Sequence, residues 1–159
     1  HMKKKIETNF FCKSNHWSRR MIKIKDIVNN IIKLDNLGFK KSNFYFFNFI
    51  FVDNKNIKKI NRKYRSKNKI TDVLTFVKLL NDSNNRNEVY CDIFFSAETI
   101  KKDANRNLID FYDHITHLII HCFLHVNGYD HKKKIDFLKI KKLEEKILVK
   151  FNIESPYFL

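Results

Sequence analysis

The stretch His121-Cys-Phe-Leu-His125-Val-Asn-Gly128-Tyr-Asp-His131 combines a helical spacing with a turn signal. Side chains four residues apart lie on one face of a helix, so His121 and His125 can direct their imidazoles at one point. Gly128 can adopt the backbone that ends a helix, and the chain can then return His131 to the same point. Three imidazoles with a fourth position open are typical of a catalytic zinc site. The stretch therefore predicts a helix end that holds a metal ion.

The same spacing also admits a chance grouping, because five of the seven histidines lie between residues 114 and 131. A metal site and a chance grouping both stay open on spacing alone. His117 lies one turn before His121 and is expected to be a polar neighbour rather than a ligand. Zinc proteases of the His-Glu-x-x-His class place a glutamate after the first histidine, and here Cys122 occupies that position. The residues therefore argue against a protease.

The histidine stretch closes a predicted helix that begins at Asp110 or Asp113. Further strands are predicted at residues 5–11, 44–52, 71–78 and 89–95, and further helices at residues 24–37, from Asp53 onward, from Ser96 to about 105, and at 135–151. Strands and helices that alternate in this way predict an α+β (mixed α/β) fold. We expect a single domain over residues 2–159, with His1 a cloning remnant, built on one roughly four-stranded mixed sheet surrounded by about five helices.

The chain is strongly basic, with 32 Lys and Arg against 17 Asp and Glu, a net charge of +15. Such an excess indicates a nucleic-acid or anionic partner. Codon bias offers another explanation, since arginine contributes only 6 of the 32 basic residues. Three scattered cysteines indicate a reducing compartment. Neither a membrane span nor a signal peptide is predicted.

Basic residues gather between positions 55 and 69, where eight occur without an acidic one. We expect this run to form one wall of an RNA-binding cleft. Its predicted RNA-binding residues are Lys58, Lys59, Arg62, Lys63 and Arg65.

Four blocks of the chain resemble one family. The histidine stretch is similar to the His-Gly-x-Leu-His-Leu-x-Gly-Tyr-Asp-His signature of the YbeY endoribonucleases, also called rRNA maturation factors. Residues 61–76 resemble the family's Asn-x-x-Tyr-Arg and Thr-Asp-Val-Leu-Ser-Phe-Pro segments, residues 91–96 its Gly-Asp-Ile-x-Ile-Ser segment, and residues 154–157 its Pro-Tyr tail. The chain departs from these patterns at Cys122 and Cys91, where the family has glycine, and at Val77, where it has proline.

The resemblance implies a single-strand-specific, metal-dependent endoribonuclease with a zinc-hydrolase-like cleft. It assigns one Zn²⁺ per chain to His121, His125 and His131, with the native metal open, and catalytic roles to His121 and Arg65. Asp130 could orient a ligand imidazole from behind or stabilise the turn. The implied partners are single-stranded RNA, small-subunit rRNA and the ribosome, in rRNA maturation and ribosome quality control. No membrane and no other cofactor are expected, and the implied location is the cytoplasm or the matrix of a ribosome-containing organelle.

Two other functions stay open. One is a non-catalytic rRNA-binding ribosome-assembly factor with a structural zinc. The other is a different zinc metallohydrolase acting on a peptide or small ester. The basic charge favours the nuclease and the assembly factor, and the missing glutamate at position 122 weakens the hydrolase. The oligomeric state is also open.

Overall fold

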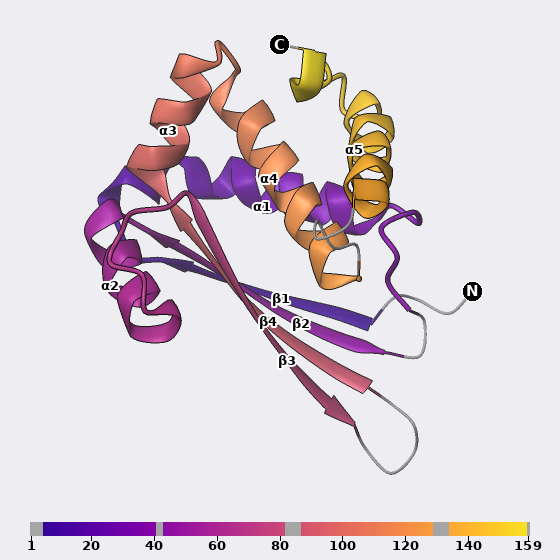
Figure 1. The fold of residues 1–159 in the computed structure, drawn as a ribbon, viewed down its shortest axis with the longest axis horizontal. Coiled ribbons are helices and arrows are strands. Elements are labelled where there is room, and N and C mark those ends of the chain that lie inside the picture. Colours follow the sequence, from indigo (N-terminus) through magenta and orange to yellow (C-terminus); the bar gives the residue numbers. More distant parts are fainter. Residues whose placement is uncertain (1–4, 41–42, 82–86, 129–133, 159) are drawn as a thin grey trace.

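Strands and helices follow one another along the chain, as the sequence predicts (Figure 1). The computed structural model describes residues 5–40, 43–81, 87–128 and 134–158. In chain order the elements are β1 (Lys5–Cys12), the 3-10 helix η1 (Asn15–Arg20), α1 (Met21–Ile32), β2 (Phe44–Val52), α2 (Asn54–Arg65), β3 (Val73–Asn81), β4 (Asn87–Ser96), α3 (Ala97–Arg106), α4 (Phe111–Val126), α5 (Lys134–Val149) and the 3-10 helix η2 (Pro156–Phe158).

The four strands form one mixed sheet in the order β1-β2-β4-β3. β2 pairs in parallel with both β1 and β4, whereas β3 pairs with β4 in the antiparallel sense. Parallel neighbours need a long crossover. The first crossover contains η1 and α1, and the second contains α2 and β3. The predicted α+β class and four-stranded mixed sheet with five α-helices are thus confirmed.

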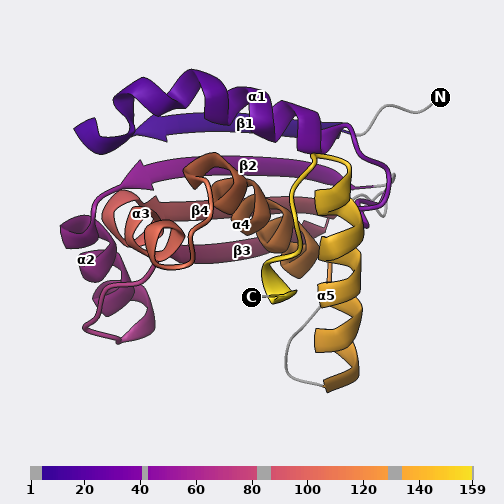
Figure 2. The same cartoon turned by 90° about the horizontal axis from the view of Figure 1, so that it is seen from above.

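The helices cover the two faces of the sheet unequally. Figure 2 shows α1 running along β1 and α4 lying over the other strands on the same face, with α3 and α5 beside α4. On the opposite face, α2 packs through Ile57, which joins Val52 and Leu74 in a small apolar cluster. The site-bearing helix α4 therefore lies on the more heavily covered face.

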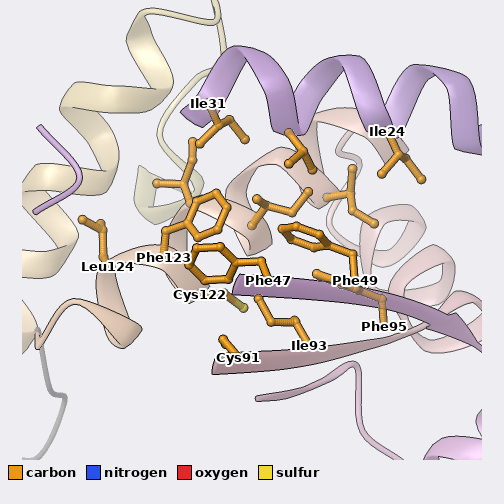
Figure 3. Close-up of a cluster of buried hydrophobic side chains, with 14 of the residues drawn as sticks. Ile24, Ile31, Phe47, Phe49, Cys91, Ile93, Phe95, Cys122, Phe123 and Leu124 are labelled. Atoms are coloured by element: carbon orange, nitrogen blue, oxygen red, sulfur yellow. The ribbon is translucent and has the colours of Figure 1, made fainter. Parts of the chain in front are cut away.

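The main core lies between the sheet and helices α1 and α4 (Figure 3). Along β2, alternate side chains are buried, as expected of a strand with two different faces. Phe47 and Phe49 meet Phe123 of α4 edge-on, with ring centroids 4.9 and 6.0 Å apart. Ile24 and Ile31 of α1 belong to the same buried cluster (Figure 3). This aromatic packing fixes where α4 sits on the sheet.

The predicted helix at residues 24–37 is wrong at its end. α1 stops at Ile32, and the amide of Leu34 turns back to the carbonyl of Ile31 at 3.0 Å. Leu37 is still fully buried, but it enters the core from a turn, and its carbonyl accepts a hydrogen bond from Asn127 Nδ2 at 2.8 Å. The apolar spacing here reflects burial on one side rather than a continuous helix.

Candidate metal centre

Helix α4 begins where Asp110 accepts hydrogen bonds from the amides of Tyr112 and Asp113, at 3.0 and 3.1 Å. Its buried residues are mainly apolar: Ile115, Thr116, Ile119, Ile120, Cys122, Phe123 and Leu124. The histidines at four-residue intervals lie along a less buried stripe of the same helix. Packing of the apolar face therefore sets the direction of the histidine stripe.

His121 and His125 lie side by side, as their spacing predicts. Their rings are nearly parallel, with an interplanar angle of 16° and centroids 6.5 Å apart. The helix ends after Val126, and Gly128 has a φ of +101°. A side chain at Gly128 would meet nothing within 4 Å, so its backbone conformation rather than space favours glycine there.

The third predicted ligand, His131, and the predicted neighbour Asp130 lie outside the described residues. The ligand set His121, His125 and His131 therefore stays a prediction. Within the described residues, a different trio is close together. His117, His121 and Glu144 offer ligand atoms that all lie within 4.8 Å of one another. This trio could hold a metal ion.

Glu144 of α5 is the residue that the sequence interpretation missed. Its side chain is fully buried. Its Oε2 is hydrogen-bonded to His117 Nε2 at 3.0 Å, and its Oε1 is hydrogen-bonded to His121 Nδ1. The hydroxyl of Tyr157 donates to Oε2 as well. The sequence did contain a signal for it. Glu144 falls at the helical spacing of Ile140, Ile147 and Leu148, which are buried, and a charged residue on such an inward-facing stripe is unusual.

The electrostatics of Glu144 follow from these partners. Burial by itself raises the pKa of the carboxyl group, but hydrogen bonds from His117, His121 and Tyr157 outweigh it and bring the pKa to about 2. The same environment acts oppositely on Tyr157, whose pKa rises because of burial and its bond to Glu144. Glu144 is thus a buried carboxylate whose charge is balanced by donors.

Arg65, the predicted catalytic arginine, is the last residue of α2 and is exposed. One guanidinium nitrogen donates to the carbonyl of Thr75 on β3 at 2.8 Å, and the group lies 5.2 Å from the ring centre of Phe76. The hydroxyl of Thr75 in turn donates to Cys122 Sγ at 3.7 Å, beside His121 on α4. Thr75 therefore contacts both the arginine and the histidine helix.

The predicted RNA-binding lysines and arginines of α2 are exposed. They are Lys58, Lys59, Arg62 and Lys63. Tyr64, on the same helix, is also 61% exposed, and its ring centre lies 5.6 Å from that of Phe76. The surface of α2 thus combines cationic side chains with an accessible aromatic ring.

Cys122 faces away from the histidine stripe and is buried against the sheet, as its offset on the helix predicts. Burial raises the pKa of its thiol to about 12, although the hydrogen bond from Thr75 acts in the other direction. Cys91, another departure from the family pattern, is buried too, whereas Val77 on β3 is exposed. None of these three residues belongs to the trio of potential ligands.

Comparison with known proteins gives a consistent result. The family model for endoribonuclease YbeY matches residues 10–152. The Buchnera aphidicola endoribonuclease YbeY is 34% identical over 158 residues, 99% of this chain and 98% of that protein. The Bartonella quintana protein of the same name is 37% identical over 109 residues, covering 68% and 69% of the two chains, and that of Pelagibacter ubique 35% over 139 residues, covering 85% and 88%.

A solved structure shares the fold. The solution structure of a Thermotoga maritima protein superposes with a TM-score of 0.55 and covers 92% of this chain and 91% of its own, at 24% identity. Among the described helices, none has the length and apolar composition needed to cross a membrane.

Proposed function

The chain belongs to the YbeY endoribonuclease family, and from this premise we propose that it cuts single-stranded RNA with the help of one bound zinc ion. The proposed substrates are small-subunit rRNA precursors and the rRNA of defective ribosomes. The proposed location is the cytoplasm or the matrix of a ribosome-containing organelle. Residues 2–159 would form a single catalytic domain. The observation that carries the metal-dependent part of the proposal is the paired stacking of His121 and His125 at the end of α4.

The residues fit a zinc ion. Imidazole nitrogens are ligands that zinc prefers, and an open three-histidine set is typical of catalytic sites. His121 already bonds through Nδ1 to Glu144, so its Nε2 is the atom offered to a metal. His125 lies beside it, and His131 would supply the third nitrogen. A zinc ion held there would polarise a phosphoryl oxygen or lower the pKa of a bound water.

Arg65 is the proposed electrostatic catalyst. Cleavage of a phosphodiester builds negative charge on the non-bridging oxygens, and a guanidinium matches this charge with two parallel hydrogen bonds. Its bond to the Thr75 carbonyl restrains the side chain without neutralising it, because a carbonyl carries no net charge. Arg65 can therefore keep a cationic fork in place at the end of α2.

RNA binding is assigned to the exposed cationic surface of α2. Lysine and arginine side chains neutralise phosphates, and an accessible ring such as Tyr64 can stack on a base. The bases of single-stranded RNA are free to stack in this way, whereas those of a duplex are not. The combination on α2 supports a preference for single strands.

The decisive experiment compares cleavage of labelled single-stranded and duplex RNA by the same protein, with and without a chelator. We expect cleavage of the single strand that stops on chelation and returns with added zinc. His125→Ala serves as the metal-site control and should be inactive under all conditions. Tight RNA binding without any cleavage would instead favour the assembly-factor function, and zinc-independent cleavage would contradict the metal site.

A further inference from the structure

Glu144 lies in an environment where a charge is costly. It is fully buried, on the same inward-facing stripe of α5 as the buried residues Ile140, Ile147 and Leu148. Burying a carboxylate is tolerated when its oxygens are paired with hydrogen-bond donors. Here both oxygens are used: Oε1 by His121, and Oε2 by His117 and Tyr157. The chain therefore keeps a buried charge whose partners are two histidines and the C-terminal segment.

The contact with His121 has a direct effect on the state of that ring. A neutral imidazole carries one N–H, and an ionised carboxylate can only accept a hydrogen bond. Because Nδ1 faces Glu144 Oε1, the proton must lie on Nδ1, which leaves the lone pair on Nε2. A carboxylate behind a histidine is the usual way in which the ring orientation and basicity of a metal ligand are set.

The C-terminal segment holds this carboxylate in place. Tyr157 lies in η2, after α5, and its hydroxyl shares Oε2 with His117. Ser155 ties the same segment to α5 through a hydrogen bond to Glu145 Oε1 at 2.9 Å, and the Lys141 ammonium lies 4.8 Å from the centre of the Tyr157 ring. The tail is thus attached to α5 at several points around Glu144.

We infer that Glu144 is a positioning residue of the metal centre: it fixes the orientation of His121, with the ring proton on Nδ1 and Nε2 as the proposed metal-binding atom. Tyr157 and His117 hold the Glu144 carboxylate in the orientation that this requires. The inference rests on the proposed function, because it takes His121 and His125 as ligands. His117 is then a partner of the carboxylate rather than a ligand. The C-terminal tail becomes part of the metal site although it contributes no ligand.

The first test measures zinc affinity by competition with a chromophoric chelator for the full-length chain. Glu144→Gln leaves one acceptor oxygen in place of two, so the side chain can no longer accept hydrogen bonds from His117, His121 and Tyr157 together. We expect zinc binding to be weaker by about 10–100-fold. Tyr157→Phe should weaken binding in the same direction but by less. The control, Lys142→Gln, also replaces a charged residue of α5 by glutamine, but at an exposed position, and it should bind zinc within about twofold of the parent.

The second test needs no metal. Histidine ¹⁵N spectra of the metal-free protein report which ring nitrogen carries the proton. We expect the Nδ1–H form of His121 in the parent and a mixture of forms in Tyr157→Phe and Glu144→Gln. If Glu144→Gln fails to fold, the parent spectrum and Tyr157→Phe carry the test. An Nε2–H form of His121 in the parent would overturn the inference.

Direct ligation by Glu144 is the competing arrangement, and His117→Gln distinguishes it. A positioning role predicts that this variant keeps its zinc, whereas direct binding by His117, His121 and Glu144 predicts a loss as complete as in His121→Ala. Zinc retention by His125→Ala would overturn the proposed metal site itself. Loss of zinc in His125→Ala together with parent-like binding in Glu144→Gln would overturn only the positioning role.

Discussion

Helices α4 and α2 carry the residues proposed to act on RNA, but they are built in opposite ways. Seven of the sixteen residues of α4 are buried, against two of the twelve in α2, namely Ile57 and Asn61. The histidines of α4 are therefore placed by the packing of the core behind them. The cations of α2 are exposed, and their proposed contacts with RNA depend largely on charge.

The comparison teaches that the two helices should respond differently to substitution. A change on α4 alters the position of a ligand or the packing that supports it, so its effect should be large and local. A change on α2 removes one charge among many, so its effect should be small and sensitive to salt. Arg65 is the exception on α2, because Thr75 and Phe76 hold its guanidinium.

The largest effect is expected at the proposed ligands. Replacing His121, His125 or His131 by alanine should reduce bound zinc from one ion per chain to none and abolish RNA cleavage, because two imidazoles hold zinc poorly. His117→Ala should keep the ion. Metal analysis of the purified variants measures this, and full zinc retention by the His131 variant would contradict the proposed ligand set.

The next effect tests the core behind the histidines. Phe123→Ala removes a ring that packs on Phe47 and Phe49, and we expect the free energy of unfolding to fall by about 3–5 kcal/mol. Lys59→Ala on α2 should change it by less than about 0.5 kcal/mol. Urea unfolding of both variants without metal gives the comparison. Equal losses would show that the two helices are not built differently.

Arg65→Ala should slow cleavage by about 10²–10³-fold while zinc content and most RNA affinity remain, because a preorganised donor acts on charge that grows in the transition state. Arg65→Lys keeps the charge but loses the planar fork, so it should stay impaired. Single-turnover cleavage with enzyme in excess separates this step from binding. Arg62→Ala, on the same helix, is the control. If Arg65→Ala cleaves saturating RNA at the parent rate, Arg65 is only a phosphate contact and not a catalytic residue.

The smallest effect concerns the other cations of α2. Each phosphate contact with a single strand contributes about 0.7 to the slope of log affinity against log salt. Neutralising Lys58, Lys59 and Lys63 together should flatten that slope by roughly 1–2 units. Affinities measured over a salt series test this. An unchanged slope would mean that these lysines do not contact RNA phosphates and reflect codon bias instead.

Local patterns predicted much of the fold but little of what lies behind the site. Residues 44–52 form a strand with the predicted bounds, and Asp110 caps α4, because both signals are contained in short segments. Ser96 occupies the predicted N-cap of α3, but its hydroxyl donates to Asn54 Oδ1 instead of capping the helix. That partner lies 42 residues away, beyond the reach of a local rule.

The same reason explains why Glu144 was missed. Its contact with His121 joins residues 23 positions apart and exists because α5 folds back on α4. The spacing of His121 and His125 is a property of one helix, so it could be predicted. A hydrogen bond between two helices depends on how they pack, which the spacing of either helix does not contain.

The strand order limits the order in which parts of the chain can fold during synthesis. At Asn48, β2 bonds to residues 39 positions earlier and 44 positions later, and ordering such distant segments makes folding slow compared with a helical bundle. During synthesis, β2 cannot gain its second neighbour until β4 has left the ribosome, and α4 and α5 emerge later still. Trp17 is fully buried and packs against Phe51 of β2 at 4.9 Å and against Phe111 of α4 at 5.7 Å, so its fluorescence reports on both stages. The end of the molecule that carries the proposed metal centre is therefore the last part to be synthesised.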